Sequence, residues 1–199
     1  MTAPTERGPR ERMVFSAAQL LRRGGVAAAG MREVAAHAEA PRGSLQHYFP
    51  GGKEQLVNEA VGWAGRYAAR RVARFLAALP EPTPGGLFAA MVRQWTDEYE
   101  AAGFAGGCPV AAVTVDCAQH TASTREAATA AFEAWTGAVA DALTGMRVPR
   151  ERAGSLATLM ISSLEGAILM ARARHDLRPL TTVSAELGPL LDAAVERDD

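Results

Sequence analysis

The sequence predicts an all-α protein, and three observations support this fold class. Alanine is abundant, apolar residues recur at spacings of three and four, and no segment of useful length alternates apolar and polar residues as a strand would. With 199 residues, of which 48% are hydrophobic and 22% are charged, the composition is that of an ordinary globular protein. The length allows one domain or two small ones.

Three short helices are expected in the first quarter of the chain. The first ends at Gly24-Gly25, and its apolar face is formed by Met13, Ala17, Leu20 and Leu21. The second is expected over 31–38, with an inward face of Val34, Ala35 and Ala38. Pro41 favours the first turn of the third helix, which runs to about Phe49 and stops before Pro50-Gly51-Gly52.

Longer helices are expected in the remainder of the chain. The first of them covers 53–79 and is followed by the break Pro80-Glu81-Pro82. Thr83 is a plausible N-cap because its hydroxyl can accept a hydrogen bond from the first turn, and Pro84 suits the first helical position. The later helices are expected over 83–102, 108–118, 121–143, 149–176 and 182–197, the last with a kink at Pro189.

The segment 31–53 has the order of a helix-turn-helix followed by the start of a third helix. In such a motif, exposed residues at the start of the second helix reach base edges in the major groove, while its neighbour braces on phosphates. The residues in that position here are Pro41, Arg42, Gly43, Ser44, Gln46 and His47. The segment therefore predicts a surface that contacts double-stranded DNA.

The residue types at these positions fit that chemistry. Arg42 can pair with guanine O6 and N7, and Gln46 with adenine N6 and N7. Gly43 allows a close approach of the backbone. Lys53, the only lysine in the chain, opens the next helix, where the helix N-terminus and a cation can jointly hold a phosphate. The small core that fixes the recognition helix is expected to consist of Leu45, Tyr48 and Phe49.

The charge distribution agrees with this division. Residues 1–53 carry eight basic against four acidic side chains, a net charge of +4, whereas the whole chain has a net charge of −1. A basic N-terminal part on an acidic remainder suits phosphate contact by the N-terminal part alone. No apolar run approaches the roughly 18 residues of a membrane span, and residues 1–12 lack the apolar stretch of a secretory signal. We expect a cytoplasmic protein that does not bind membranes.

The cysteines and histidines predict no metal or cofactor site. Cys108 and Cys117 lie nine positions apart, which would place them on opposite faces of a helix, so we expect two buried, reduced thiols. The four histidines show no metal-ligand spacing with the cysteines or with one another.

Two segments resemble the tetracycline-repressor (TetR) family of bacterial regulators, and in particular its LmrA/YxaF-like subgroup. These are APRGSLQHYFPGGKEQL at 40–56, within the DNA-binding segment, and GGCPVAAVTVDCA at 106–118, which is similar to a helix of the regulatory domain. The resemblance implies a homodimeric, ligand-responsive repressor. It also implies a three-helix DNA-binding domain over 1–52 and a six-helix ligand-binding and dimerisation domain over 53–199, of which 53–79 is the connecting helix.

Carried over position by position, the resemblance makes DNA contacts of Arg32, Arg42, Gly43, Ser44 and His47, with Lys53 on a phosphate. Two residues depart from the family pattern. Glu39 occupies a turn position that usually holds glycine and often needs a positive φ, so strain or a different turn is expected. Gln46 replaces a usual tyrosine, which removes a phosphate contact or exchanges it for a base contact.

The resemblance also implies an apolar effector pocket around the connecting helix. The candidate lining residues combine aromatic, methionine and polar side chains, which suit a small hydrophobic or aromatic effector; they are Trp63, Tyr67, Phe88, Met91, Trp95, Tyr99, Val113, Thr114, Cys117, Trp135, Met160 and Ser163. The same residues at helical spacing also fit a plain core.

A small-residue apolar face on the helix over 149–176 suits close packing of helices. With the last helix it would build a two-fold four-helix interface, for which the candidate residues are Leu156, Leu159, Ala167, Leu187 and Leu191.

Three alternatives remain open at this point. An all-α enzyme is poorly supported, because neither a nucleophile–base spacing nor a phosphate-binding loop is present. A DNA-binding regulator could instead take a redox signal through Cys117. A helical interaction protein could have lost DNA binding through Glu39 and Gln46.

Overall fold

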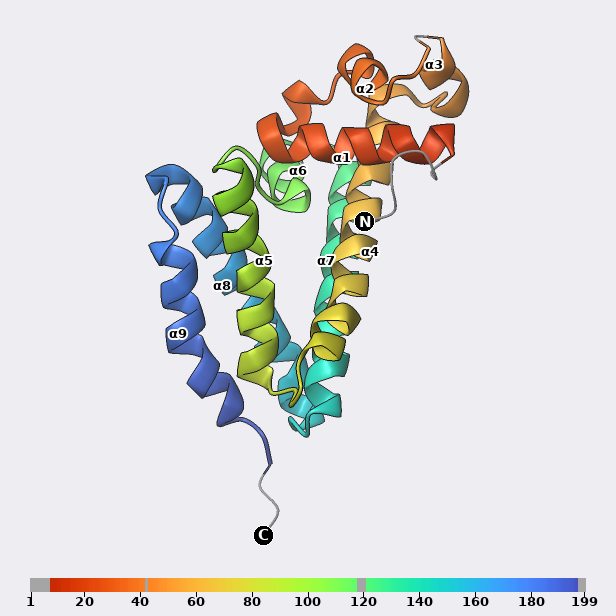
Figure 1. Cartoon of the computed structure of the whole chain (residues 1–199). Helices are drawn as coiled ribbons and strands as arrows, with labels where there is room; N and C mark the ends of the chain where they lie inside the picture. Colours follow the sequence, from red (N-terminus) through yellow and green to blue (C-terminus); the bar gives the residue numbers. More distant parts are fainter. Residues whose placement is uncertain (1–7, 42, 118–120, 197–199) are drawn as a thin grey trace. The chain divides into compact units, whose positions relative to one another are not determined.

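The computed structural model describes residues 8–41, 43–117 and 121–196, and within these ranges it is helical and contains no strand (Figure 1). This confirms the all-α fold class. The helices are α1 Pro9–Ala28, α2 Met31–His37, α3 Ser44–Tyr48, α4 Gly52–Ala78, α5 Pro84–Ala102, α6 Pro109–Cys117, α7 Ala122–Gly145, α8 Arg150–Arg174 and α9 Arg178–Asp192.

The chain packs into two compact units. Unit 1 comprises residues 1–66 and 108–132, and unit 2 comprises residues 67–107 and 133–199. Helices α4 and α7 each pass from one unit into the other. Helix α6 and the start of α7 therefore pack with the N-terminal helices, although they are distant from them in the sequence.

In unit 1, the glycine pair interrupts α1 as predicted. Gly24 has φ −142° and Gly25 has φ 65°, so the regular helix stops there and one further turn follows. A positive φ of this kind favours glycine, which explains the residue type at position 25. The predicted apolar face is buried at Met13, Ala17 and Leu21 but only half-buried at Leu20.

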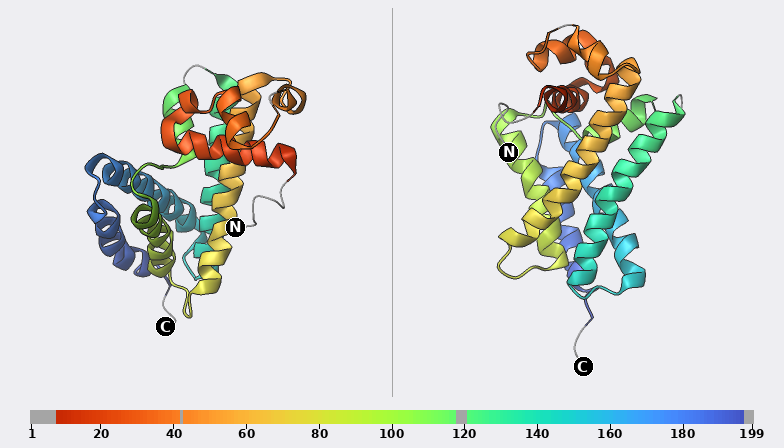
Figure 2. Two further views of the ribbon diagram at one scale, coloured as in Figure 1. Left: turned by 45° about the horizontal axis from the view of Figure 1, so that its top comes forward. Right: turned by 90° about the vertical axis from the view of Figure 1, so that its right-hand side faces the viewer.

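In unit 2, helices α5, α8 and α9 lie side by side (Figures 1 and 2). Thr83 is the N-cap of α5, as predicted, and its hydroxyl oxygen accepts the Gly86 N–H at 3.0 Å. The Asp192 carboxylate at the end of α9 accepts the Gly85 N–H at 2.7 Å. The side chains that α5 buries include Phe88, Met91, Trp95 and Tyr99.

The last helix differs from its prediction. Helix α9 begins at Arg178, earlier than expected, because Pro179 occupies its first turn and the Asp176 carboxylate accepts the Arg178 N–H at 2.9 Å. This hydrogen bond and a second one from the Arg178 side chain hold the pKa of Asp176 below its ordinary value. Pro189 lies inside the helix. The helix ends at Asp192, earlier than predicted, and Arg197 itself lies outside the described residues.

Helix α8 has the length and composition of a membrane span, since it has 25 residues and a window of mean hydropathy 1.4. Its inner face is buried in unit 2, where the packed residues include Ala157, Met160, Ile161, Leu164 and Ile168. These buried residues of α8 therefore belong to a helical core.

Candidate nucleic-acid interface

Helices α2 and α3 with the turn between them form the predicted helix-turn-helix (Figure 1). Helix α2 ends in a Schellman motif: the Ala40 N–H bonds the Ala35 carbonyl at 2.9 Å and the Glu39 N–H bonds the Ala36 carbonyl at 3.2 Å. Glu39 occupies the left-handed position of this motif with φ 51°. The expected positive φ is confirmed, and the motif forms with glutamate in place of glycine.

Helix α3 is shorter than predicted. It begins at Ser44, because both the Ser44 N–H and its hydroxyl donate to the Pro41 carbonyl, at 3.0 and 2.6 Å, and close a turn before the helix. Pro41 therefore precedes the helix and is not in its first turn. The Ser44 side chain is half-buried and helps to hold this turn.

One face of α3 is buried and the other is exposed, as a recognition helix requires. Leu45 is buried and Phe49, which follows the helix, is fully buried, whereas Gln46 and His47 are exposed. Tyr48 is only half-buried, and its ring contacts the His47 ring edge-on at 5.2 Å. The other predicted DNA contacts Arg32, Pro41 and Gly43 are exposed, and Arg42 lies outside the described residues.

Lys53 lies in the first turn of α4, directly after Gly52, which has φ 68°. The turn is held by two hydrogen bonds, from the Gly52 N–H to the Phe49 carbonyl at 2.9 Å and from the Gly51 N–H to the Gln55 side chain at 2.9 Å. The half-buried lysine thus lies at a helix N-terminus, as a phosphate contact requires.

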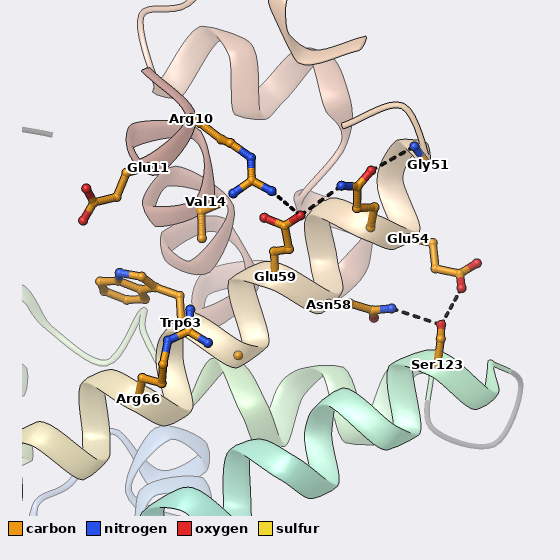
Figure 3. A pocket seen from close by; sticks show the side chains of 12 residues that line it. Arg10, Glu11, Val14, Gly51, Glu54, Asn58, Glu59, Trp63, Arg66 and Ser123 are labelled. Atoms are coloured by element: carbon orange, nitrogen blue, oxygen red, sulfur yellow. Dashed lines mark hydrogen bonds and ion pairs between the residues drawn. The ribbon is translucent and has the colours of Figure 1, made fainter. Parts of the chain in front are cut away.

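A network that the sequence interpretation missed joins the end of α3 to α1 and α4. Figure 3 shows the part of it between Arg10, Glu59 and Gly51. Arg10 forms an ion pair with Glu59 at 2.6 Å, and its guanidinium lies 5.2 Å from the centre of the Phe49 ring. Gln55 donates to the same Glu59 oxygen at 3.0 Å. The i, i+4 spacing of Gln55 and Glu59 was the available signal for this network.

Arg10, Gln55 and Glu59 of this network also line an open cleft of about 700 Å³ within unit 1 (Figure 3). Of the predicted effector-pocket residues only Trp63 lines this cleft, and its indole contacts Phe15 edge-on at 5.4 Å. The remaining lining is largely polar or charged and includes Glu11, Glu54, Asn58, Arg66 and Ser123.

The other predicted pocket residues are distributed over both units. In unit 2, Tyr67 and Ser163 are half-buried, and the buried residues are Phe88, Met91, Trp95, Tyr99, Trp135 and Met160. In unit 1, Val113 is buried and Thr114 and Cys117 are half-buried. The Tyr99 ring lies 5.9 Å from Trp95 and 4.9 Å from Phe104. Burial and ring contacts of this kind fit both a core and a pocket lining.

The predicted dimer contacts differ in exposure within the single chain. Ala167, Leu187 and Leu191 are buried among the helices of their own chain. Leu156 is half-buried, and Leu159 is 45% exposed. The structure instead leaves other large apolar side chains of α8 and α9 exposed, namely Leu169, Met170 and Leu190.

Two short helices joined by a tight turn, the second with one buried and one exposed face, have the arrangement of a helix-turn-helix DNA-binding motif. Comparison with known families specifies the class. The model "Bacterial regulatory proteins, tetR family" matches residues 16–60, and the model "Transcriptional regulator LmrA/YxaF-like, C-terminal domain" matches residues 84–186. The chain belongs to the TetR family of bacterial transcriptional regulators, and its C-terminal part is of the LmrA/YxaF-like type.

Individual relatives agree with this assignment. An uncharacterized HTH-type transcriptional regulator of Mycobacterium tuberculosis is 41% identical over 191 residues, which cover 92% of this chain and 94% of the relative. The HTH-type transcriptional regulator LmrA of Bacillus subtilis is 27% identical over 182 residues, 92% of this chain and 96% of that protein. A TetR regulator from Legionella pneumophila shares the fold with a TM-score of 0.79 at 20% identity, covering 96% of this chain and 100% of that one.

Proposed function

We propose that the protein is a ligand-responsive repressor that binds a palindromic operator as a homodimer and is released from it by a small hydrophobic or aromatic effector. The observation that carries the proposal is the division of α3, where Leu45 is buried and Gln46 and His47 are exposed. Amide and imidazole groups on a free helix face can donate to and accept from base edges.

The proposed DNA contacts fall into two kinds. Gln46, His47 and Arg42 would contact base edges and so select the sequence. Lys53 at the N-terminus of α4 and Arg32 on α2 would contact phosphates and so fix the position of the protein on the duplex. The proposal therefore places phosphate contacts at both ends of the motif and the base contacts between them.

The proposed dimer interface follows from the exposed apolar side chains of unit 2. Leu159, Leu169 and Met170 on α8 are 45%, 55% and 47% exposed, and Leu190 on α9 is 66% exposed. Exposed apolar residues concentrated on two neighbouring helices are typical of a surface that a second copy covers. In a two-fold dimer the recognition helices would lie roughly 34–36 Å apart and reach successive major grooves.

The proposed effector acts by selecting a state of the dimer. The aromatic and methionine side chains buried in unit 2 supply an apolar environment for a flat ligand. Such a ligand lowers operator affinity only if it binds the released state more tightly than the DNA-bound state.

Two variants test the proposed contacts on a duplex from the region upstream of the protein's own gene. Arg42→Ala should cost about 1–3 kcal/mol of binding free energy and relax the sequence preference, since it removes a base contact. Lys53→Ala should weaken binding to all sequences alike and reduce the slope of log K against log[salt] by about one. Wild-type protein without salt-dependent retention of this duplex would contradict the proposed function.

A further inference from the structure

Helix α6 belongs to the regulatory part of the sequence but packs in unit 1. It lies within the C-terminal family match at 84–186, yet it packs against α1 (Figure 1), with Val110 and Val113 buried. We use the name α6–α7 corner for residues 114–117 of α6 and 122–125 of α7. Each side of this corner makes a polar contact with one of the helices that flank the helix-turn-helix.

The contact to α1 is made by Asp116. Its Oδ2 atom accepts the Val26 backbone N–H at 2.7 Å, the first N–H after the glycine break. A β-carbon at Gly25 would lie 2.2 Å from the same oxygen, so the carboxylate occupies space that any other residue type would fill. Asp116 thereby caps the short final turn of α1 from a distant part of the chain.

The contact to α4 is made by Ser123. Its hydroxyl donates to the Glu54 carboxylate and accepts a hydrogen bond from Asn58 Nδ2 at 3.0 Å (Figure 3). Glu54 and Asn58 are one helical turn apart, and Glu54 directly follows Lys53. The hydroxyl therefore bridges α7 to the turn of α4 that carries the proposed phosphate contact.

We infer that Asp116 and Ser123 are positioning residues for DNA recognition, because each holds one of the two helices that flank the helix-turn-helix. This inference rests on the proposed function. The physical reason is that α1 precedes the motif and α4 follows it, so the hydrogen bonds of Asp116 to α1 and of Ser123 to α4 help to fix the orientation in which α3 is presented. Loss of either bond leaves the DNA-contacting side chains intact but less precisely placed.

The test compares variants of the full-length protein on the same upstream duplex. Asp116→Ala and Ser123→Ala should each weaken binding roughly three- to tenfold. The slope of log K against log[salt] should stay at its wild-type value, because no phosphate contact is removed. Asp116→Asn keeps an oxygen acceptor in the same place and should bind within about twofold of wild type. Asp97→Ala, at an exposed position of α5, is the matched control.

A second readout reports the Asp116 contact directly. Amide hydrogen exchange at Val26 should be slow in the wild type and in Asp116→Asn, and faster in Asp116→Ala. Wild-type operator affinity in Asp116→Ala would overturn the inference, and so would an equal loss in Asp97→Ala. If the wild-type protein does not bind the duplex, the proposed function is wrong. Independently of DNA binding, unchanged Val26 exchange in Asp116→Ala would show that the Asp116 contact is absent.

Discussion

The helix-turn-helix and the helices of unit 2 differ in what their functional side chains must do. Helix α3 presents Gln46 and His47 to solvent. The proposed DNA-contacting residues could be inferred from their spacing within the helix-turn-helix. In unit 2 the corresponding candidates, among them Phe88, Met91 and Trp95, are buried. Reading DNA requires particular polar groups on a surface, whereas sensing an apolar ligand requires an interior shape. A sequence shows residue types directly but shows an interior shape only indirectly.

The largest expected effect is on the small core that supports the recognition helix. Phe49→Ala removes a fully buried ring and should lower the free energy of unfolding by about 3–5 kcal/mol, measured by chemical denaturation. Tyr48→Ala, at a half-buried position, should cost less. If Phe49→Ala and Tyr48→Ala lower the free energy of unfolding equally, burial on one side does not hold α3 in place. The contrast between α3, with its exposed face, and the buried candidates of unit 2 would then be wrong.

The next effect concerns the surface of unit 2. Leu190→Glu places a charge on a side chain that is 66% exposed in one chain. If a second copy covers this surface, the buried unpaired charge should weaken self-association by about 2–4 kcal/mol. Analytical ultracentrifugation would then show monomer where the wild type is dimeric. Ala134→Glu, on the exposed side of α7, should leave the mass unchanged; an unaffected dimer in Leu190→Glu would place the interface elsewhere.

A smaller effect tests the turn of the helix-turn-helix. Glu39 has φ 51°, a conformation that costs a residue with a β-carbon about 1–2 kcal/mol and costs glycine little. Replacing glutamate by glycine removes this cost, but part of the stability gained is lost because glycine is more flexible in the unfolded chain. Glu39→Gly should therefore raise the free energy of unfolding by about 0.5 kcal/mol, while Glu39→Ala, which keeps the β-carbon, should not. A destabilised glycine variant would mean that the glutamate side chain itself stabilises the turn.

The smallest expected effect separates ligand sensing from redox sensing. Cys108 and Cys117 are not joined by a disulfide bond; Cys108 is buried and Cys117 is half-buried at the end of α6. The effector is proposed to release the protein from DNA by binding in an apolar pocket. Mild peroxide should therefore change operator affinity by less than about twofold. A larger change that Cys117→Ser abolishes would favour the redox alternative.

The sequence was most informative where local chemistry decides the structure. The glycine break at 24–25 and the Thr83 cap were predicted, since each depends on one or two residues. At Glu39 the sequence left strain or a different turn open, and the structure has the positive φ. The start of α3 was placed too early, because a proline that suits a helix start equally suits the turn before it.

Features that depend on distant parts of the chain could not be predicted in the same way. The packing of α6 with α1 and the hydrogen bond from Val26 to Asp116 join residues ninety positions apart, and no local pattern encodes them. The burial of Leu187 and Leu191 in their own chain was not predicted for a related reason: an apolar helix face does not show whether its own chain or a second copy covers it.

The central claim is that α3 reads an operator as one half of a symmetric dimer. Hydroxyl-radical footprinting of the wild-type protein on its upstream region tests this most directly. The account predicts two protected half-sites related by a two-fold axis, with centres separated by about one helical turn of 10–10.5 base pairs or a multiple of it. Protection that is absent, or that is spread evenly along the duplex without paired half-sites, would contradict it.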